Sequence, residues 1–271
     1  MPVDLPALCD DLAAEHVALD ALVADLDEPG WRTPTPAVGW DVRDTIGHLA
    51  FFDEAATLAA RDPAAFERDM SGGVAVDADG FMASVVERAR AMAGSDVLAW
   101  WRSARSSFLA TFRVLDPSTR VPWFGPPMSA ASKVTARLME TWAHGQDVVD
   151  GLGLPASARP ATVRLRHVAH IAVGARPFSY MAHGMEPPST PVRVELAPPE
   201  SVGGDAWVWG PEDAPDRVSG PALDFCLVLT QRRHVEDTAL VASGALAEEW
   251  LRIGQAFAGP PGEGRRPGQF G

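Results

Sequence analysis

The sequence predicts an α+β protein with two domains. An antiparallel four-helix bundle over residues 1–155 is followed by a smaller α+β domain over residues 156–271. Three observations favour this fold class. Four amphipathic segments, separated by breakers rich in Pro and Gly, fill the first part of the chain. The later part alternates in the manner of strands. A chain of 271 residues is long enough for two modest cores.

The first two helices of the bundle are bounded by clear start and stop signals. The first begins at Leu5, from which apolar residues recur mostly at helical spacing. Residues 28–39 are rich in Pro and Gly and end it. The second helix starts with Asp41 as its N-cap and Asp44 in its first turn. It ends near residues 62–63, because proline cannot continue a helix interior.

The rest of the bundle follows the same pattern. Residues 79–115 contain one or two helices, with Ser95 and Asp96 as an internal cap. Residues 116–129 form a loop, and a further helix covers about residues 130–149. Because each amphipathic helix must bury an apolar face, we expect an up-and-down bundle with one longer crossover.

In the second domain we expect helices and short strands together. The predicted helices cover residues 161–184, 221–229 and 244–257, and the predicted strands cover residues 191–196 and 207–209. The tail after residue 257 is rich in Gly and Pro and is expected to be irregular.

Composition excludes several classes of function. The formal net charge of −13 opposes binding to a phosphate backbone, so we expect no nucleic-acid partner. No run approaches the roughly 20 apolar residues of a spanning helix, and no basic signal region is present. We therefore expect a cytoplasmic protein with no membrane partner. Cys9 and Cys226 lie far apart and are expected to be buried thiols, and Lys133 is the only lysine.

Three residues carry the strongest chemical signal. Glu140 and His144 are four residues apart on a predicted helix, which leaves about 5–6 Å between their Cβ atoms. His48 lies part-way along the second helix, where the bundle can bring it to them. Two histidines and a glutamate are a recurrent ligand set for Zn²⁺ that leaves coordination positions open. The alternative is a solvated helix face, because Arg137 and Asp147 extend the same polar stripe.

Two motifs resemble those of a known family. Residues 38–50 (VGWDVRDTIGHLA) contain the pattern GW-x-V-x-D-x-x-x-H-L, and residues 140–147 (ETWAHGQD) contain E-x-x-x-H-x-x-D. Both are similar to motifs of the DinB-like, mycothiol-dependent maleylpyruvate isomerase family. Residues 218–262 also resemble the C-terminal domain of an actinobacterial branch that is described only as metal-binding proteins.

The resemblance implies a metal site and a thiol. It implies that His48, Glu140 and His144 hold a divalent metal, with Zn²⁺ expected first and Ni²⁺ or Fe²⁺ as alternatives. It also implies mycothiol or a similar low-molecular-weight thiol as cosubstrate. Asp147 matches the last position of the second motif, where it would orient a ligating imidazole or make a structural contact at the helix end.

The predicted function is that of a metal-dependent isomerase or thiol transferase acting on a small electrophilic or unsaturated acid. Coordination to a divalent cation would deprotonate the thiol. One alternative is a thiol-independent enzyme of secondary metabolism that uses Lewis-acid or metal-hydroxide chemistry. Another is a non-catalytic metal-binding module. The oligomeric state is left open.

Further residues are candidates for binding the substrate. An arginine can hold a carboxylate in a bidentate fork, although surface arginines are commonly just solvated. A tryptophan in the loop before residue 130 could wall a pocket or pack beneath its loop. A histidine three residues after His167 could belong to a metal-binding pair or to an exposed helix face. These candidates are Arg176, Arg232, Arg233, His170 and Trp123.

Overall fold

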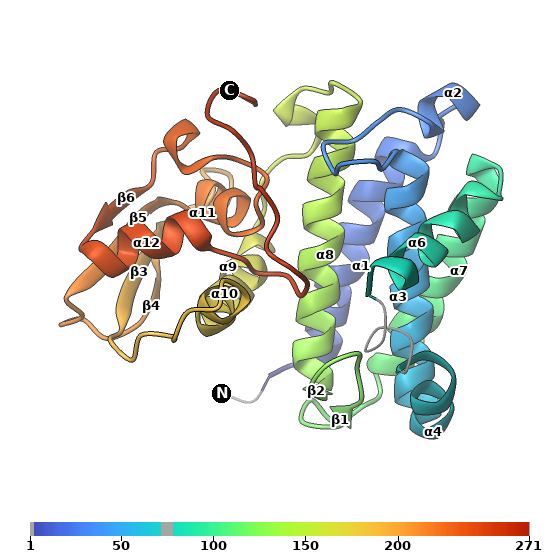
Figure 1. Ribbon diagram of the computed structural model, residues 1–271, viewed down its shortest axis with the longest axis horizontal. Coiled ribbons are helices and arrows are strands. Elements are labelled where there is room, and N and C mark those ends of the chain that lie inside the picture. The colour runs from blue at the N-terminus through green and yellow to red at the C-terminus, as the bar shows by residue number, and fades with distance from the viewer. Residues whose placement is uncertain (1–2, 72–77, 271) are drawn as a thin grey trace. The chain divides into compact units, whose positions relative to one another are not determined.

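The computed structural model describes residues 3–71 and 78–270, and these form two compact units, Met1–Arg159 and Pro160–Gly271. The first unit is mainly helical and the second combines helices with a small sheet (Figure 1). The predicted fold class is therefore confirmed.

Within the described residues of the first unit, four long helices form the bundle. They are α1 (Leu5–Val23), α3 (Val42–Arg61), α7 (Gly94–Phe112) and α8 (Ala130–Gly151). The shorter elements are α2 (Glu28–Trp31), α4 (Pro63–Phe66), η1 (Glu67–Ser71), α6 (Ala78–Arg90), β1 (Arg120–Val121) and β2 (Met128–Ser129).

The order of the long helices in space differs from a simple up-and-down arrangement. Among the four long helices, α3 packs along α7 and, less extensively, along α8, and α1 packs along α8 and, less extensively, along α7 (Figure 1). The consecutive helices α1 and α3 therefore lie diagonally, as do α7 and α8. We expected one longer crossover and find two, over residues 24–41 and 113–129, because each of these connections is long enough to cross the bundle.

Local capping explains where α3 begins. The Asp41 side chain accepts a hydrogen bond from the Asp44 backbone N–H at 2.8 Å, and the Asp44 side chain accepts one from the Asp41 N–H at 3.2 Å. This reciprocal capping box satisfies two amides at the helix N-terminus. Arg90 of α6 also binds the buried Asp44 carboxylate at 2.6 Å. The predicted cap is confirmed, and a tertiary ion pair reinforces it.

The predicted cap at Ser95 and Asp96 is wrong. Helix α7 begins at Gly94, and no side chain caps it locally. The Gly94 backbone N–H donates instead to Glu28 Oε1 at 2.7 Å, so a residue distant in the sequence satisfies this helix end. The residue must be glycine here, because an added Cβ would meet the Trp31 ring at 2.2 Å.

The loop predicted over residues 116–129 contains a short hairpin. Strands β1 and β2 pair antiparallel, with Arg120 opposite Ser129 and Val121 opposite Met128. Strands of two residues are too short to show an alternating pattern, so the sequence did not reveal them.

The second unit is built on a four-stranded sheet with strand order β4-β3-β5-β6. Strand β3 pairs parallel with β5 and antiparallel with β4, and β6 pairs antiparallel with β5. The strands are β3 (Val192–Ala197), β4 (Trp207–Trp209), β5 (Asp216–Pro221) and β6 (Val241–Ser243). The helices are η2 (Ala156–Ala158, which precedes the unit), α9 (Leu165–Gly174), α10 (Arg176–Ala182), α11 (Ala222–Leu229), η3 (Val235–Asp237) and α12 (Ala245–Ile253).

Several predicted boundaries in this unit are wrong. The single helix expected over residues 161–184 is two helices, α9 and α10, and proline lies in the first turn of α10. Strand β5 was not predicted, because its Asp, Ser, Gly and Pro residues are uncommon in strands. Strand β6 was not predicted. Both form through pairing with distant segments, which periodicity within one segment does not report.

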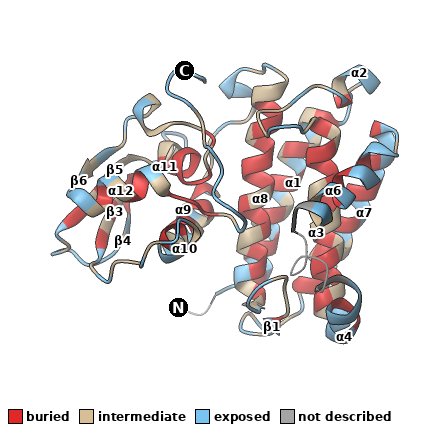
Figure 2. Ribbon diagram, in the orientation of Figure 1, coloured by how far each residue is buried: buried red, intermediate tan, exposed pale blue. Residues whose placement is uncertain are grey.

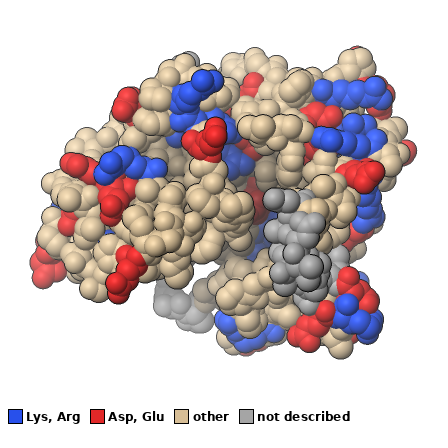
Figure 3. Space-filling model, viewed as in Figure 1, with Lys and Arg blue, Asp and Glu red and all other residues tan. Residues whose placement is uncertain are grey.

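The buried residues lie mostly on the facing sides of the long helices and on the sheet (Figure 2). Cys9 and Cys226 are free and fully buried, as expected. In the described part of the chain, no helix combines the length and apolar character needed to cross a membrane. On the face drawn in Figure 3, basic and acidic side chains are interspersed. Ion pairs such as Arg217 with Glu195, at 2.7 Å, neutralise part of the surface charge.

Candidate metal centre

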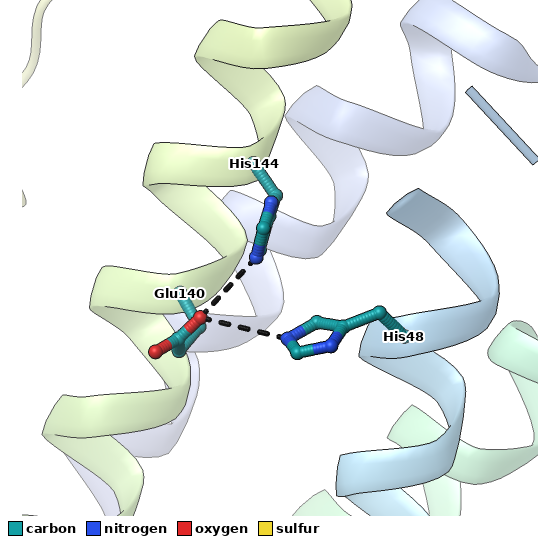
Figure 4. Close-up of side chains that lie close together, drawn as sticks. All are labelled: His48, Glu140 and His144. Carbon is teal, nitrogen blue, oxygen red and sulfur yellow. Dashed lines mark ion pairs between the residues drawn. The ribbon is translucent and has the colours of Figure 1, made fainter. Parts of the chain in front are cut away.

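The three predicted ligands converge between α3 and α8. One ligand atom from each of His48, Glu140 and His144 lies within 4.8 Å of the others. Glu140 Oε2 lies 3.7 Å from His48 Nε2 and 3.4 Å from His144 Nε2 (Figure 4). Among the described residues, this is the only group of three or more His, Cys, Asp or Glu side chains that could hold a metal ion.

Local structure and helix packing together create this convergence. Glu140 and His144 are one turn apart on the same face of α8. His48 lies in the second turn of α3, whose starting point is fixed by the capping box at Asp41. Because α3 packs against α8, the imidazole of His48 points at the carboxylate of Glu140 (Figure 4).

The protonation states in this cluster fit a metal ligand set. Burial lowers the pKa of His48 to about 4, against the opposing effect of the Glu140 carboxylate. Burial alone would raise the pKa of Glu140, but its interactions with the neighbouring His144 and His48 rings outweigh burial and hold that pKa well below its usual range. A neutral imidazole and an ionised carboxylate are the forms that coordinate a divalent cation.

Asp147 contacts the other side of the His144 ring. Its Oδ2 lies 3.2 Å from His144 Nδ1, and its side chain is fully buried. A carboxylate at this position holds the proton on Nδ1 and leaves Nε2 as the acceptor that faces Glu140. The contact orients an imidazole, one of the two roles considered for Asp147 from the sequence.

Aromatic side chains surround the two histidines. The Trp40 ring stacks on His144, with centroids 5.9 Å apart and planes at 17°, and lies 5.2 Å from the His48 ring. The Phe52 ring lies 4.7 Å from the His48 ring. Trp40 belongs to the first motif, but it was not among the site residues predicted from the sequence. Its place in that motif was the available signal.

This aromatic lining continues into the loop before α8. The Trp123 ring stacks on the Phe66 ring and also contacts the Phe52 ring, with ring centroids 5.9 Å apart in both pairs. Phe124 contacts Trp123 at 4.9 Å. Only the Phe52 ring therefore separates Trp123 from His48 in this series of ring contacts. Its role as the wall of a substrate pocket stays a prediction.

The polar stripe on α8 faces the protein interior, so its interpretation as a solvated helix face is wrong. Arg137 Nε binds Asp53 Oδ1 at 2.8 Å, and both side chains are almost completely buried. Arg137 also donates to the Leu49 carbonyl at 3.1 Å. A charge in the helix interface is tolerated only when it is paired, and periodicity cannot show that Asp53 supplies the partner.

The candidates in the second unit make contacts within that unit. Arg176 donates to the Thr190 carbonyl at 2.9 Å, and Arg232 to the Thr230 carbonyl at 2.5 Å. Trp209 donates to His170 at 3.2 Å. Arg233 lines a cavity of about 440 Å³ that other basic side chains share. These side chains are Arg252, Arg265, Arg266, His183 and His234. Substrate binding by Arg176, Arg232, Arg233 and His170 stays a prediction.

Comparison with known proteins gives the relatives of this chain. A family model described as the mycothiol maleylpyruvate isomerase N-terminal domain matches residues 12–149. A second model, described as wyosine base formation, matches residues 188–243. Uncharacterized proteins from two strains of Mycobacterium tuberculosis are each 46% identical over 255 residues, which covers 94% of this chain and 96% of theirs.

Solved structures show the same fold. The crystal structure of a mycothiol-dependent maleylpyruvate isomerase matches with a TM-score of 0.59 at 14% identity, covering 89% of this chain and 93% of that one. A histidine-to-alanine mutant of the isomerase matches with a TM-score of 0.58 at the same identity and coverage. At this identity the likeness concerns the fold.

Proposed function

Because the chain belongs to the mycothiol maleylpyruvate isomerase family, we propose that it is an enzyme that uses a low-molecular-weight thiol, mycothiol or a close analogue. Its substrate would be a small electrophilic or unsaturated acid, and the reaction an isomerisation or a thiol transfer. The observation that carries the proposal is the convergence of His48, Glu140 and His144 within 4.8 Å.

The donor set suits a divalent cation. Two imidazoles and one carboxylate favour Zn²⁺, with Ni²⁺ or Fe²⁺ as the next choices. Three protein ligands leave positions for water, thiol or substrate, as in catalytic sites rather than closed structural ones. A bound cation would supply the positive charge that lowers the pKa of a thiol from its usual value of about 8.5.

An external thiol is the better source of the nucleophile, because the chain's own cysteines are unsuited. Burial, the largest effect, raises the pKa of Cys9 to about 11. Burial also raises the pKa of Cys226. Neither residue belongs to the candidate metal centre. Both thiols are therefore protonated at neutral pH.

The proposed chemistry balances without any further reagent. The thiolate adds to one carbon of an activated double bond, and the electron pair of that bond moves into the conjugated carbonyl. Rotation about the resulting single bond, followed by expulsion of the thiolate, gives the other geometric isomer. Protonation before expulsion gives a stable thioether, which is the thiol-transfer outcome.

The residues around the ligands have defined parts in this proposal. Asp147 fixes the orientation of the His144 ring. Trp40 and Phe52 cover the imidazoles with apolar surface. Such a lining excludes water, which strengthens electrostatic interactions and protects a reactive adduct.

Metal content is the first test. Protein purified without added metal should hold about one divalent ion per chain by elemental analysis, and the double variant His48→Ala and His144→Ala should lose it. His170→Ala is the matched control, since this histidine lies outside the cluster. Full metal occupancy in the double variant would contradict the assignment.

Thiol dependence is the second test. Mycothiol should raise the melting temperature of the metal-loaded protein, because a ligand that binds the native state stabilises it. Maleylpyruvate is the first substrate to assay, with glutathione as a comparison thiol. Turnover of acids without any thiol would favour the thiol-independent enzyme. If no acid is turned over and no thiol raises the melting temperature, the non-catalytic module is favoured.

A further inference from the structure

The only lysine of the chain is buried on α8. The Lys133 side chain is 1% exposed, and its Nζ lies 3.2 Å from the centroid of the Trp123 ring. Within the described residues, Nζ has no hydrogen-bond partner. A buried amine without an acceptor is costly, so its retention calls for a physical reason.

Lys133 lies on the same stripe of α8 as the candidate ligands. Residues 133, 137, 140 and 144 are spaced by four, three and four, so their side chains follow one face of the helix. Glu140 follows Lys133 by seven positions, which correspond to a rise of about 10 Å along the helix. The stripe therefore carries the Lys133 amine at one end and the candidate metal centre at the other.

Continuous ring contacts join the two ends. The Trp123 ring, which faces the amine, has its centroid 5.9 Å from that of Phe52, and the Phe52 and His48 ring centroids lie 4.7 Å apart. A small acid lying along this aromatic surface would span from the amine to the ligands, with its apolar carbons against the rings.

Within the described residues, no carboxylate forms an ion pair with the Lys133 amine. The Asp53 carboxylate is bound by Arg137, one turn along α8 from Lys133. Burial, reinforced by the Arg137 charge, lowers the pKa of Lys133 to about 6. The free protein thus holds the amine mainly uncharged near neutral pH, and a carboxylate arriving beside it would favour uptake of one proton.

We propose that Lys133 binds a carboxylate of the acidic substrate and holds its reactive carbons toward Glu140 and His144. This inference rests on the proposed function for the substrate class, and it makes Lys133 the residue that selects acids over their esters. Trp123 is only half-buried. A ligand therefore reaches the amine by displacing this ring, which otherwise covers Nζ.

The single lysine allows a direct test. Protein labelled with ¹³C and ¹⁵N lysine gives one side-chain signal, which can be followed while maleate or dimethyl maleate is added. Maleate should shift this signal and convert the amine to its charged form, and the ester should do neither. A signal that saturating maleate leaves unmoved, or an absence of maleate binding at millimolar concentration, overturns the proposal.

Variants give an independent measure. Lys133→Met should weaken maleate binding by about tenfold to a hundredfold, the usual effect of losing a hydrogen bond to a charged group. Arg88→Met is the matched control, because it removes another cation–π pair, Arg88 over Trp100. Maleate affinity equal to that of the unmodified protein in Lys133→Met overturns the proposal. If this variant does not fold, the response of the lysine signal in the unmodified protein still tests whether Lys133 binds the carboxylate.

The two proposals can fail separately. The titration is run on metal-free and on metal-loaded protein. A shifted lysine signal in a protein that binds no metal and no thiol supports the carboxylate site and contradicts the proposed function. If Lys133→Met keeps thiol-dependent turnover and the same preference for acid over ester, the carboxylate site is contradicted and the proposed function is not.

Discussion

His144 is contacted on both nitrogens, by Glu140 at Nε2 and by Asp147 at Nδ1. Both partners come from the same helix, so the ring is held before any ligand arrives. Preorganisation of this kind lowers the entropic cost of binding a metal. At the residue scale, the α8 motif therefore encodes two candidate ligands, Glu140 and His144, together with the carboxylate that orients the imidazole.

Asp147→Asn should lower metal affinity by about 10- to 100-fold, as is typical for loss of a carboxylate behind a ligating histidine. The amide has nearly the same shape, so the helix content should be retained. Competition against a chelator measures the affinity, and circular dichroism checks the fold. Asp150→Asn, on the same helix but outside the candidate centre, is the control. Equal affinities in the two variants would show that Asp147 has no part in metal binding.

Helix pairs in the bundle are fixed by specific polar contacts as well as by apolar packing. Asp53 of α3 binds Arg137 of α8, and Asp20 of α1 binds Arg102 and Arg105 of α7 at 2.7 and 2.5 Å. Each contact joins residues that are far apart in the sequence. At the element scale these pairs determine which residues of neighbouring helices lie opposite each other.

Stability should depend on Asp20 in a pH-dependent way. Hydrogen bonding to Arg102, the largest effect, and the Arg105 charge lower the pKa of Asp20. Its contribution is therefore fully present above the unfolded-state pKa of about 3.9, and is lost as the pH falls through the lower folded-state pKa. Asp20→Asn should cost about 1 kcal/mol of unfolding free energy at pH 7.

Urea unfolding at several pH values measures this effect. The difference between Asp20→Asn and the unmodified protein should shrink toward zero in acid. Asp25→Asn, at an exposed position just beyond α1, should show little difference at any pH. A cost that stays constant down to acidic pH would mean that the loss is not electrostatic.

The whole molecule consists of two compact units, and the candidate ligands all lie in the first, Met1–Arg159. The sequence-based boundary is at residue 155. Arg159 binds the buried Glu15 of α1 and donates to the Trp142 carbonyl of α8 at 2.5 Å. The four residues beyond the sequence-based boundary therefore contribute to the packing of the first unit.

A fragment of residues 1–159 should fold and bind the divalent ion, because it contains the bundle core and all three candidate ligands. A fragment of residues 1–155 should be about 3 kcal/mol less stable, since it loses the partner of a buried carboxylate. Thermal unfolding of both fragments with and without added Zn²⁺ measures the difference. Equal stability of the two would show that the contacts of Arg159 contribute nothing.

The sequence by itself determined the features that depend on neighbours along the chain. The capping box at Asp41 and the spacing of Glu140 and His144 are properties of single helices, and both are found as expected. The motifs around them also gave the family. Such features are set within a few residues, where propensity and hydrogen bonding act directly.

Only the tertiary structure decided the features that depend on distant partners. These are the approach of His48 to Glu140, the inward orientation of the α8 stripe, the strands β5 and β6, and the buried amine of Lys133. A helix face is solvated or buried according to what packs against it, and a short strand exists only when another strand pairs with it. Burial and pairing are properties of the folded chain, which is why periodicity alone left a solvated helix face open as the alternative for this stripe.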